Sequence, residues 1–116
     1  MDFEKLTRLA GEEIRRTLAD LPAEIRRSAE TVPVFLEKSP DVDDLASGID
    51  EDTLGLFDES PAGLPTPRIR LWLLNLWDYA DGDEDLYREE VRLTLLHELG
   101  HFLGWDEEDL EERGLG

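Results

Sequence analysis

The chain has 116 residues, 40% of them hydrophobic, which is enough for one modest core, so we expect a single domain over residues 1–116. Thirty acidic residues against twelve basic ones give a net charge of -18, which repels nucleic-acid phosphates and anionic lipids and favours cations and basic segments of other proteins. The absence of cysteine excludes disulfides and thiolate metal sites.

The sequence carries no sign of a targeting or membrane segment. MDFEKLTRLAGEE, at the start, is charged from its second residue and lacks the apolar stretch of a signal peptide. No apolar run approaches the ~18 residues that a membrane span needs. We therefore expect a soluble, cytoplasmic protein that binds neither membranes nor nucleic acid.

Two helices are predicted before the first strand. Apolar side chains recur at helical spacing from Phe3 to Leu18, with charged residues between them, so we expect a helix over residues 3–19. Leu21-Pro22 interrupts this pattern, and the segment PAEIRRSAE predicts a second, short helix.

Three segments are typical of strands. TVPVFLEK is one, and its Pro33 argues against a central strand unless it stands at the strand's start. The acidic DVDDLASGIDED reads as a loop, and TLGLFDE, closed by the turn-rich SPAGLPTP, is a second short strand. In RIRLWLLNLW, residues 68–77, Ile69 and Leu71 alternate with Arg70, which predicts a strand with one buried face.

The rest of the chain is predicted to be helical. Asp83 can cap a long helix from about Glu84 to Leu103, because a short acidic side chain accepts the free N–H groups at a helix start. Gly104 is placed to end that helix, and Asp106 to cap a last short one, EEDLEER. The order helix, strands, helix, helix indicates an α+β domain with a small sheet.

Both histidines of the chain lie in LLHELGHFLGWDEED, residues 95–109. In a helix, residues four apart differ by about 40° in azimuth, so His97 and His101 can both reach one zinc ion at ~2.0–2.1 Å. Glu98 lies about 100° round from His97, beside the metal and its bound water. Zinc lowers the pKa of that water to about 7, and Glu98 can take its proton as the water attacks a carbonyl.

A packed or solvated pair of helical histidines is the competing interpretation. Against it, the segment holds all the histidines of the chain, and its helix is apolar on nearly every side, so we expect a buried site. Two imidazoles buried side by side are costly without a shared partner. The spacing in its helical context therefore favours metal binding.

TLLHELGHFLGWDEEDLEERGL resembles the bacterial zincin-like metallopeptidases of minimal size, and the resemblance extends upstream to VPVFLEKSPD and LGLFDE. It implies a reduced zincin-like fold: a small mixed sheet packed on an HExxH active-site helix, with an N-terminal helix and a short C-terminal one. In zincins the edge strand above the active-site helix holds extended substrate by backbone pairing. By analogy that strand is Arg68 to Leu74 here.

The third metal ligand must be a carboxylate if the protein supplies it, since no cysteine or third histidine is left. The metzincin-like spacing His-x-x-x-His-x-x-Gly-x-x-ligand falls on Glu107, although the methionine of a metzincin turn is absent. Asp106 and Asp109 compete with Glu107, but both fit a capping box at the start of the last helix. We therefore favour Glu107.

Two functions follow from this segment. The first is a zinc-dependent metallopeptidase with one zinc ion held by His97, His101 and Glu107 and with Glu98 as general base, acting on a peptide or protein substrate. The acidic surface favours basic substrates. The second is a non-proteolytic metal-binding module for regulation or protein interaction, since 116 residues leave little chain for cleft walls.

Overall fold

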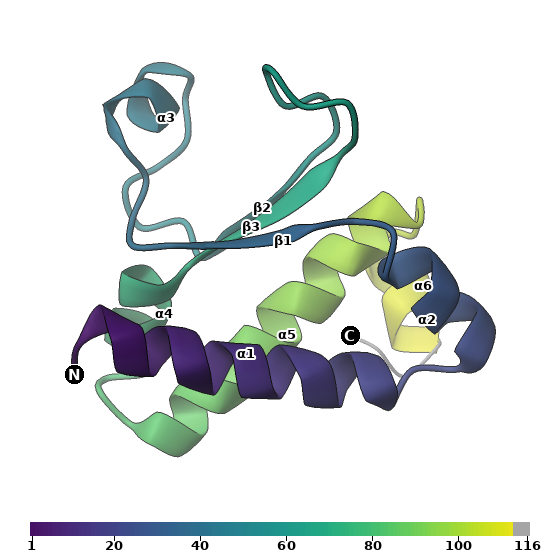
Figure 1. The fold of residues 1–116 in the computed structure, drawn as a ribbon, viewed down its shortest axis with the longest axis horizontal. Helices are drawn as coiled ribbons and strands as arrows, with labels where there is room; N and C mark the ends of the chain where they lie inside the picture. Colours follow the sequence, from purple (N-terminus) through teal and green to yellow (C-terminus); the bar gives the residue numbers. More distant parts are fainter. Residues whose placement is uncertain (113–116) are drawn as a thin grey trace.

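The computed structural model describes residues 1–112, apart from the side chains of Glu107 and Leu110. Within these residues a mixed three-stranded sheet packs against helices (Figure 1), so the predicted α+β class is confirmed. No helix in this part of the chain is long and apolar enough to cross a membrane. The elements are α1 (Phe3–Ala19), α2 (Ala23–Ala29), β1 (Val34–Glu37), α3 (Val42–Ala46), β2 (Gly55–Asp58), β3 (Arg68–Trp72), α4 (Leu73–Tyr79), α5 (Glu84–Phe102) and α6 (Glu107–Glu112).

The ends of α5 follow from local chemistry. At its start the Asp83 side chain accepts a hydrogen bond from the Leu86 N–H at 3.0 Å, and Glu84 in the first turn is favoured by the helix dipole. At its end Gly104 has φ +76, a backbone conformation that glycine adopts without the strain of a Cβ. The predicted cap and stop of the long helix are confirmed.

The core lies between the sheet and the crossed pair α1 and α5, which cover the same face of the sheet (Figure 1). The Tyr87 hydroxyl, buried in this core, donates to the Leu6 carbonyl at 2.9 Å, and burial raises the pKa of Tyr87. The side chains that form the centre of this core are Leu6, Leu9, Ile69, Leu71, Leu73, Leu76, Tyr87, Val91, Leu95 and Leu99.

The sheet has the order β1-β3-β2, with β1 parallel and β2 antiparallel to β3. Pro33 stands just before β1, an edge strand, as its missing N–H requires. β3 is the central strand, so the predicted edge strand Arg68 to Leu74 is wrong. The edge that packs against α5 belongs to β2.

Two other sequence predictions are corrected. The strand predicted over residues 68–77 ends at Trp72, and the chain continues as α4. After Trp72 the consecutive residues Leu73 and Leu74 are both apolar, so the period-two alternation ends and no longer distinguishes a strand from a buried helix. DVDDLASGIDED, predicted as a loop, contains α3, which begins with a capping box between Asp41 and Asp44.

Arg70 reaches from β3 toward the face of the sheet opposite the core and joins three elements. Its guanidinium donates to both carboxylate oxygens of Glu37 at 2.8 Å and to both of Asp44 at 2.7 Å, and it stacks over the Trp72 ring at 4.8 Å. The Arg70 side chain is almost fully buried, at 7% exposed. The strand predicted to have one buried face is therefore buried on both, because an ion-paired cluster covers the second.

Hydrogen bonding from Arg70 lowers the pKa of Asp44 from 3.8 to about 2, with a further contribution from the Asp41 N–H. A carboxyl whose folded-state pKa is depressed stabilises the fold above its unfolded pKa, and that contribution is lost as pH falls. We expect the gap in free energy of unfolding between the parent and Asp44→Asn to narrow between pH 3.8 and about 2. Urea denaturation across this range measures the gap, and a constant gap would contradict the assignment.

Candidate metal centre

α5 brings three side chains of the HExxH segment together. The Nε2 atoms of His97 and His101 are 3.1 Å apart, and the rings meet edge to face at 4.7 Å between centroids. With one carboxylate oxygen of Glu98, the candidate ligand atoms all lie within 4.8 Å of one another. Among the described residues this is the cluster of histidine and acidic side chains suited to hold a metal ion.

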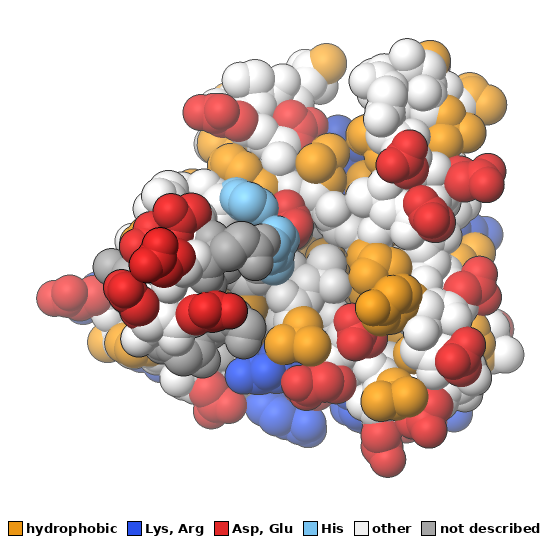
Figure 2. Space-filling view, turned by 180° about the vertical axis from the view of Figure 1, so that it is seen from behind, with side chains coloured by type: hydrophobic (Ala, Val, Ile, Leu, Met, Phe, Trp, Pro, Cys, Tyr) orange, Lys and Arg blue, Asp and Glu red, His pale blue; other side chains and the backbone are white. Residues whose placement is uncertain are grey.

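The cluster lies at the surface, so the prediction of a buried site is wrong. His101 is exposed and His97 half-buried, while Glu98 is 9% exposed (the histidines are pale blue in Figure 2). The reason is azimuth: Leu95 and Leu99 face the core, and the histidines two residues on lie on the opposite side of the helix. Apolar residues such as Leu93 led to the prediction that the helix is buried on nearly every side, but Leu93 is only half-buried.

The donor set fits a metal ion. Two imidazole nitrogens that share one tetrahedral zinc at ~2.0–2.1 Å stand about 3.3 Å apart. The Nε2 atoms of His97 and His101 stand at 3.1 Å, facing each other from consecutive turns of α5. Imidazole nitrogens, with or without a carboxylate, are the ligands of catalytic zinc in proteins that use no cysteine.

Glu98 also contacts the edge of the sheet. Its Oε1 accepts a hydrogen bond from the Phe57 N–H on β2 at 2.8 Å. Beside this contact lies a hollow of ≈ 240 Å³, which is lined by Leu54, Gly55, Leu93, Thr94, His97 and Glu98. The candidate metal ligand and the candidate base thus open onto the free edge of the sheet. The contact joins residues 41 apart and has no local sequence signal.

Gly55 is what allows β2 to lie so close to α5. A Cβ at this position would stand 2.6 Å from Thr94 Cγ2 and 3.1 Å from the Arg70 carbonyl oxygen. We expect Gly55→Ala to cost about 1–3 kcal/mol of stability through overpacking. Thermal unfolding measures the loss. Combining it with Thr94→Ser, which removes the clashing methyl group, should recover part of it. A Gly55→Ala protein as stable as the parent would contradict the close approach.

The acids after α5 have different structural duties. The Asp109 N–H donates to Asp106 Oδ1 at 2.9 Å, and the Asp106 N–H donates to Asp109 Oδ2 at 3.2 Å. This reciprocal pair is a capping box at the start of α6, so the predicted cap at Asp106 is confirmed. Glu107 is the first residue of α6, but its side chain lies outside the described part of the chain.

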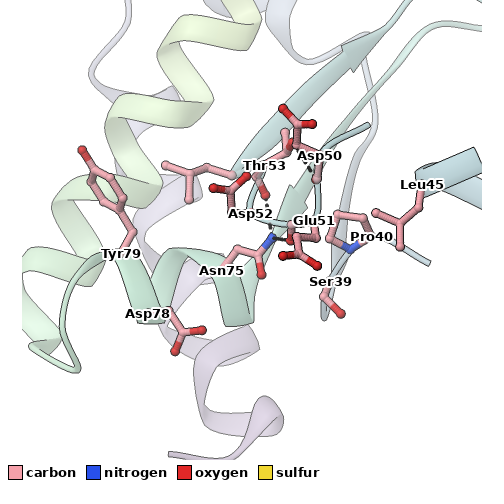
Figure 3. A pocket seen from close by; sticks show the side chains of 11 residues that line it. Ser39, Pro40, Leu45, Asp50, Glu51, Asp52, Thr53, Asn75, Asp78 and Tyr79 are labelled. Carbon is pink, nitrogen blue, oxygen red and sulfur yellow. Dashed lines mark hydrogen bonds between the residues drawn. The ribbon is translucent and has the colours of Figure 1, made fainter. Parts of the chain in front are cut away.

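A second, larger cavity of ≈ 920 Å³ lies between the loop before β2 and the helix α4 (Figure 3). Asn75 orders its wall by donating to the backbone carbonyls of Glu51 and Thr53, both at 2.8 Å. Leu54 lines both this cavity and the hollow beside Glu98. The acidic residues that line it are Asp50, Glu51, Asp52 and Asp78.

Comparison with known proteins agrees with this geometry. No match to the chain is found among the curated proteins. The family model of the zincin-like metallopeptidases matches residues 29–116, a range that includes all three strands and the helix carrying His97, Glu98 and His101. Because the match covers most of the chain and includes the cluster of His97, Glu98 and His101, the chain belongs to the zincin-like metallopeptidase family.

Proposed function

We propose that the protein is a zinc-dependent peptidase in which His97 and His101 bind the metal and Glu98 is the general base. The observation that carries the proposal is the grouping of the two imidazoles and the carboxylate within 4.8 Å beside the free edge of β2. Family membership supports a metallopeptidase, and the donor set favours zinc.

Glu98 and β2 have separate roles in the proposed reaction. A zinc ion bound there supplies a Lewis acid that lowers the pKa of water and polarises the peptide carbonyl. Glu98, with a carboxylate beside both imidazoles, takes the proton of the attacking water and passes it to the leaving amine. β2 is the edge strand next to α5, so an extended peptide would lie along it and pair with outward-facing backbone groups other than the Phe57 N–H, which Glu98 occupies. In this role β2 replaces the segment Arg68 to Leu74.

For the third ligand we propose Glu107. The carboxylates of Asp106 and Asp109 are used in the capping box of α6, whereas a residue at the first helical position has no capping duty. We expect Glu107→Gln to weaken zinc binding by at least ~100-fold, more than the loss of a group that only supports a ligand. Competition with a chelator measures the affinity. Glu108→Gln is the matched control, and an equal effect of the two changes would contradict the assignment.

The substrate class follows from the family and from charge. The family implies peptide substrates, and we expect peptides with basic residues to be favoured. The acids around the larger cavity and the net charge of -18 attract cations, and Leu54 lines both that cavity and the hollow beside Glu98. Sequencing the products of a peptide library would show enrichment of Lys and Arg near the cleaved bond.

A non-proteolytic metal-binding module is the second candidate. The hollow beside Glu98 measures ≈ 240 Å³, whereas small-ligand sites usually begin at ~300 Å³. We therefore expect it to bind substrate weakly. Incubating a peptide library with the zinc-loaded and the metal-free protein separates the two. Products formed by the zinc-loaded protein alone support the peptidase. Bound zinc without any cleavage supports the module.

A further inference from the structure

The hydrogen bond between the Phe57 N–H and Glu98 is not part of the sheet. β2 pairs with β3 on one side, where the Trp72 N–H donates to the Leu54 carbonyl at 2.9 Å. In an antiparallel strand the backbone N–H and C=O groups of successive residues point alternately to its two sides, so those of Leu54 and Leu56 point to β3. The backbone groups of Gly55 and Phe57 therefore point to the free edge, where an N–H normally donates to water or to an incoming strand. Here the Phe57 N–H meets Glu98 Oε1 at 2.8 Å instead.

Two contacts on either side of Glu98 set the height of β2 above the helix. Gly55 lies against Thr94, one turn before Glu98, at a separation that leaves no room for a Cβ. The Phe57 ring packs edge to face on Phe102, one turn after Glu98, with 5.8 Å between centroids. The strand is thus fastened to α5 both before and after the point where its N–H meets the carboxylate.

We propose that the backbone N–H of Phe57 is a positioning group for the general base, outside the HExxH motif. This rests on the role of Glu98 in the proposed function. Glu98 has three rotatable bonds, and a charge-assisted hydrogen bond to Oε1 removes most of the freedom that they allow. Oε2, which has no hydrogen bond to any described residue, is left to take the proton. Holding a reacting group in place lowers the barrier of the step that it performs.

Hydrogen exchange tests the bond without metal or substrate. In the metal-free parent protein, NMR should show the Phe57 amide protected from exchange, although it lies on a free sheet edge. Glu98→Ala should raise its exchange rate at least tenfold, while Glu98→Gln, which keeps a carbonyl acceptor, should preserve most of the protection. Exchange of the Phe57 amide at the rate of an exposed amide in the parent, or no change in Glu98→Ala, would overturn the proposal.

A proline at position 57 tests the catalytic consequence. Phe57→Pro removes the N–H and the ring, whereas Phe57→Ala removes the ring alone, and an edge strand tolerates proline on its free side. With zinc content unchanged, we expect kcat at least tenfold lower for Phe57→Pro than for Phe57→Ala, at similar KM. Equal kcat values, beside an active parent, would overturn the positioning role alone.

The two tests separate the inference from the function on which it rests. Absence of cleavage by the zinc-loaded parent would overturn the peptidase and, with it, any catalytic role of Phe57. If Phe57→Pro does not fold, as judged by circular dichroism, the exchange rates of the parent and the two Glu98 variants decide the matter.

Discussion

Glu98→Gln is expected to lower kcat/KM for peptide cleavage by about 10²- to 10⁴-fold, the usual contribution of a general base, while the protein keeps its zinc. The amide has the size of the carboxylate but cannot take a proton from water. Its carbonyl can still accept from the Phe57 N–H, which now meets Glu98 Oε1 at 2.8 Å, so β2 should stay in place. The loss is then chemical and not structural.

Cleavage rates together with zinc content by elemental analysis measure this effect. Glu89→Gln is the matched control, because Glu89 lies on the same helix about two turns before His97, is exposed, and pairs with Arg92 at 3.5 Å. We expect its activity to equal that of the parent. A Glu98→Gln protein that holds zinc and cleaves peptides at the parental rate would remove Glu98 from the mechanism.

Arg70→Met is expected to destabilise the fold by about 3–5 kcal/mol, because it leaves two buried or half-buried carboxylates without their cation. Glu37 and Asp44 both depend on the Arg70 guanidinium, which donates to each through two hydrogen bonds. For a chain of this size the loss corresponds to a fall in Tm of roughly 10–20 °C. α3 should detach first, since Asp44 is its link to the sheet.

Thermal and urea denaturation measure the change, and the same strand supplies the control. Arg68 pairs with Asp58 at a longer 3.6 Å, with both side chains more exposed than Arg70. Such partly exposed pairs contribute about 0–1 kcal/mol, so Arg68→Met should have a small effect. Equal losses of stability from the two changes would show that the Glu37–Arg70–Asp44 cluster stabilises the fold no more than the partly exposed Arg68–Asp58 pair does.

The sequence predicts α1, α2, α5 and α6 because their signals are local, whereas it does not predict α3 and α4. The Asp83 cap, the apolar spacing of α1 and the glycine after α5 each act within a few residues. The strand that carries Arg70, β3, was harder to predict from the sequence. The burial of its second face depends on residues 26 and 33 positions away, whose carboxylates accept hydrogen bonds from the Arg70 guanidinium.

The candidate site was also predictable only in part from the sequence. The meeting of His97, Glu98 and His101 is a property of one helix, so their spacing predicts it. Their exposure depends on which side of α5 meets the core. The free edge beside them depends on the strand order β1-β3-β2, which short strands do not disclose. The contact from Phe57 to Glu98 needs both facts and could be found only in three dimensions.

The most direct measurement is a zinc titration of the metal-free protein in which the cleavage rate of a library-selected peptide is followed. We expect the rate to rise with added zinc and to level off at one ion per chain, and we expect no cleavage when His101 is replaced by alanine. Cleavage that is present without zinc, or that persists in His101→Ala, would contradict a catalytic metal centre at the HExxH cluster.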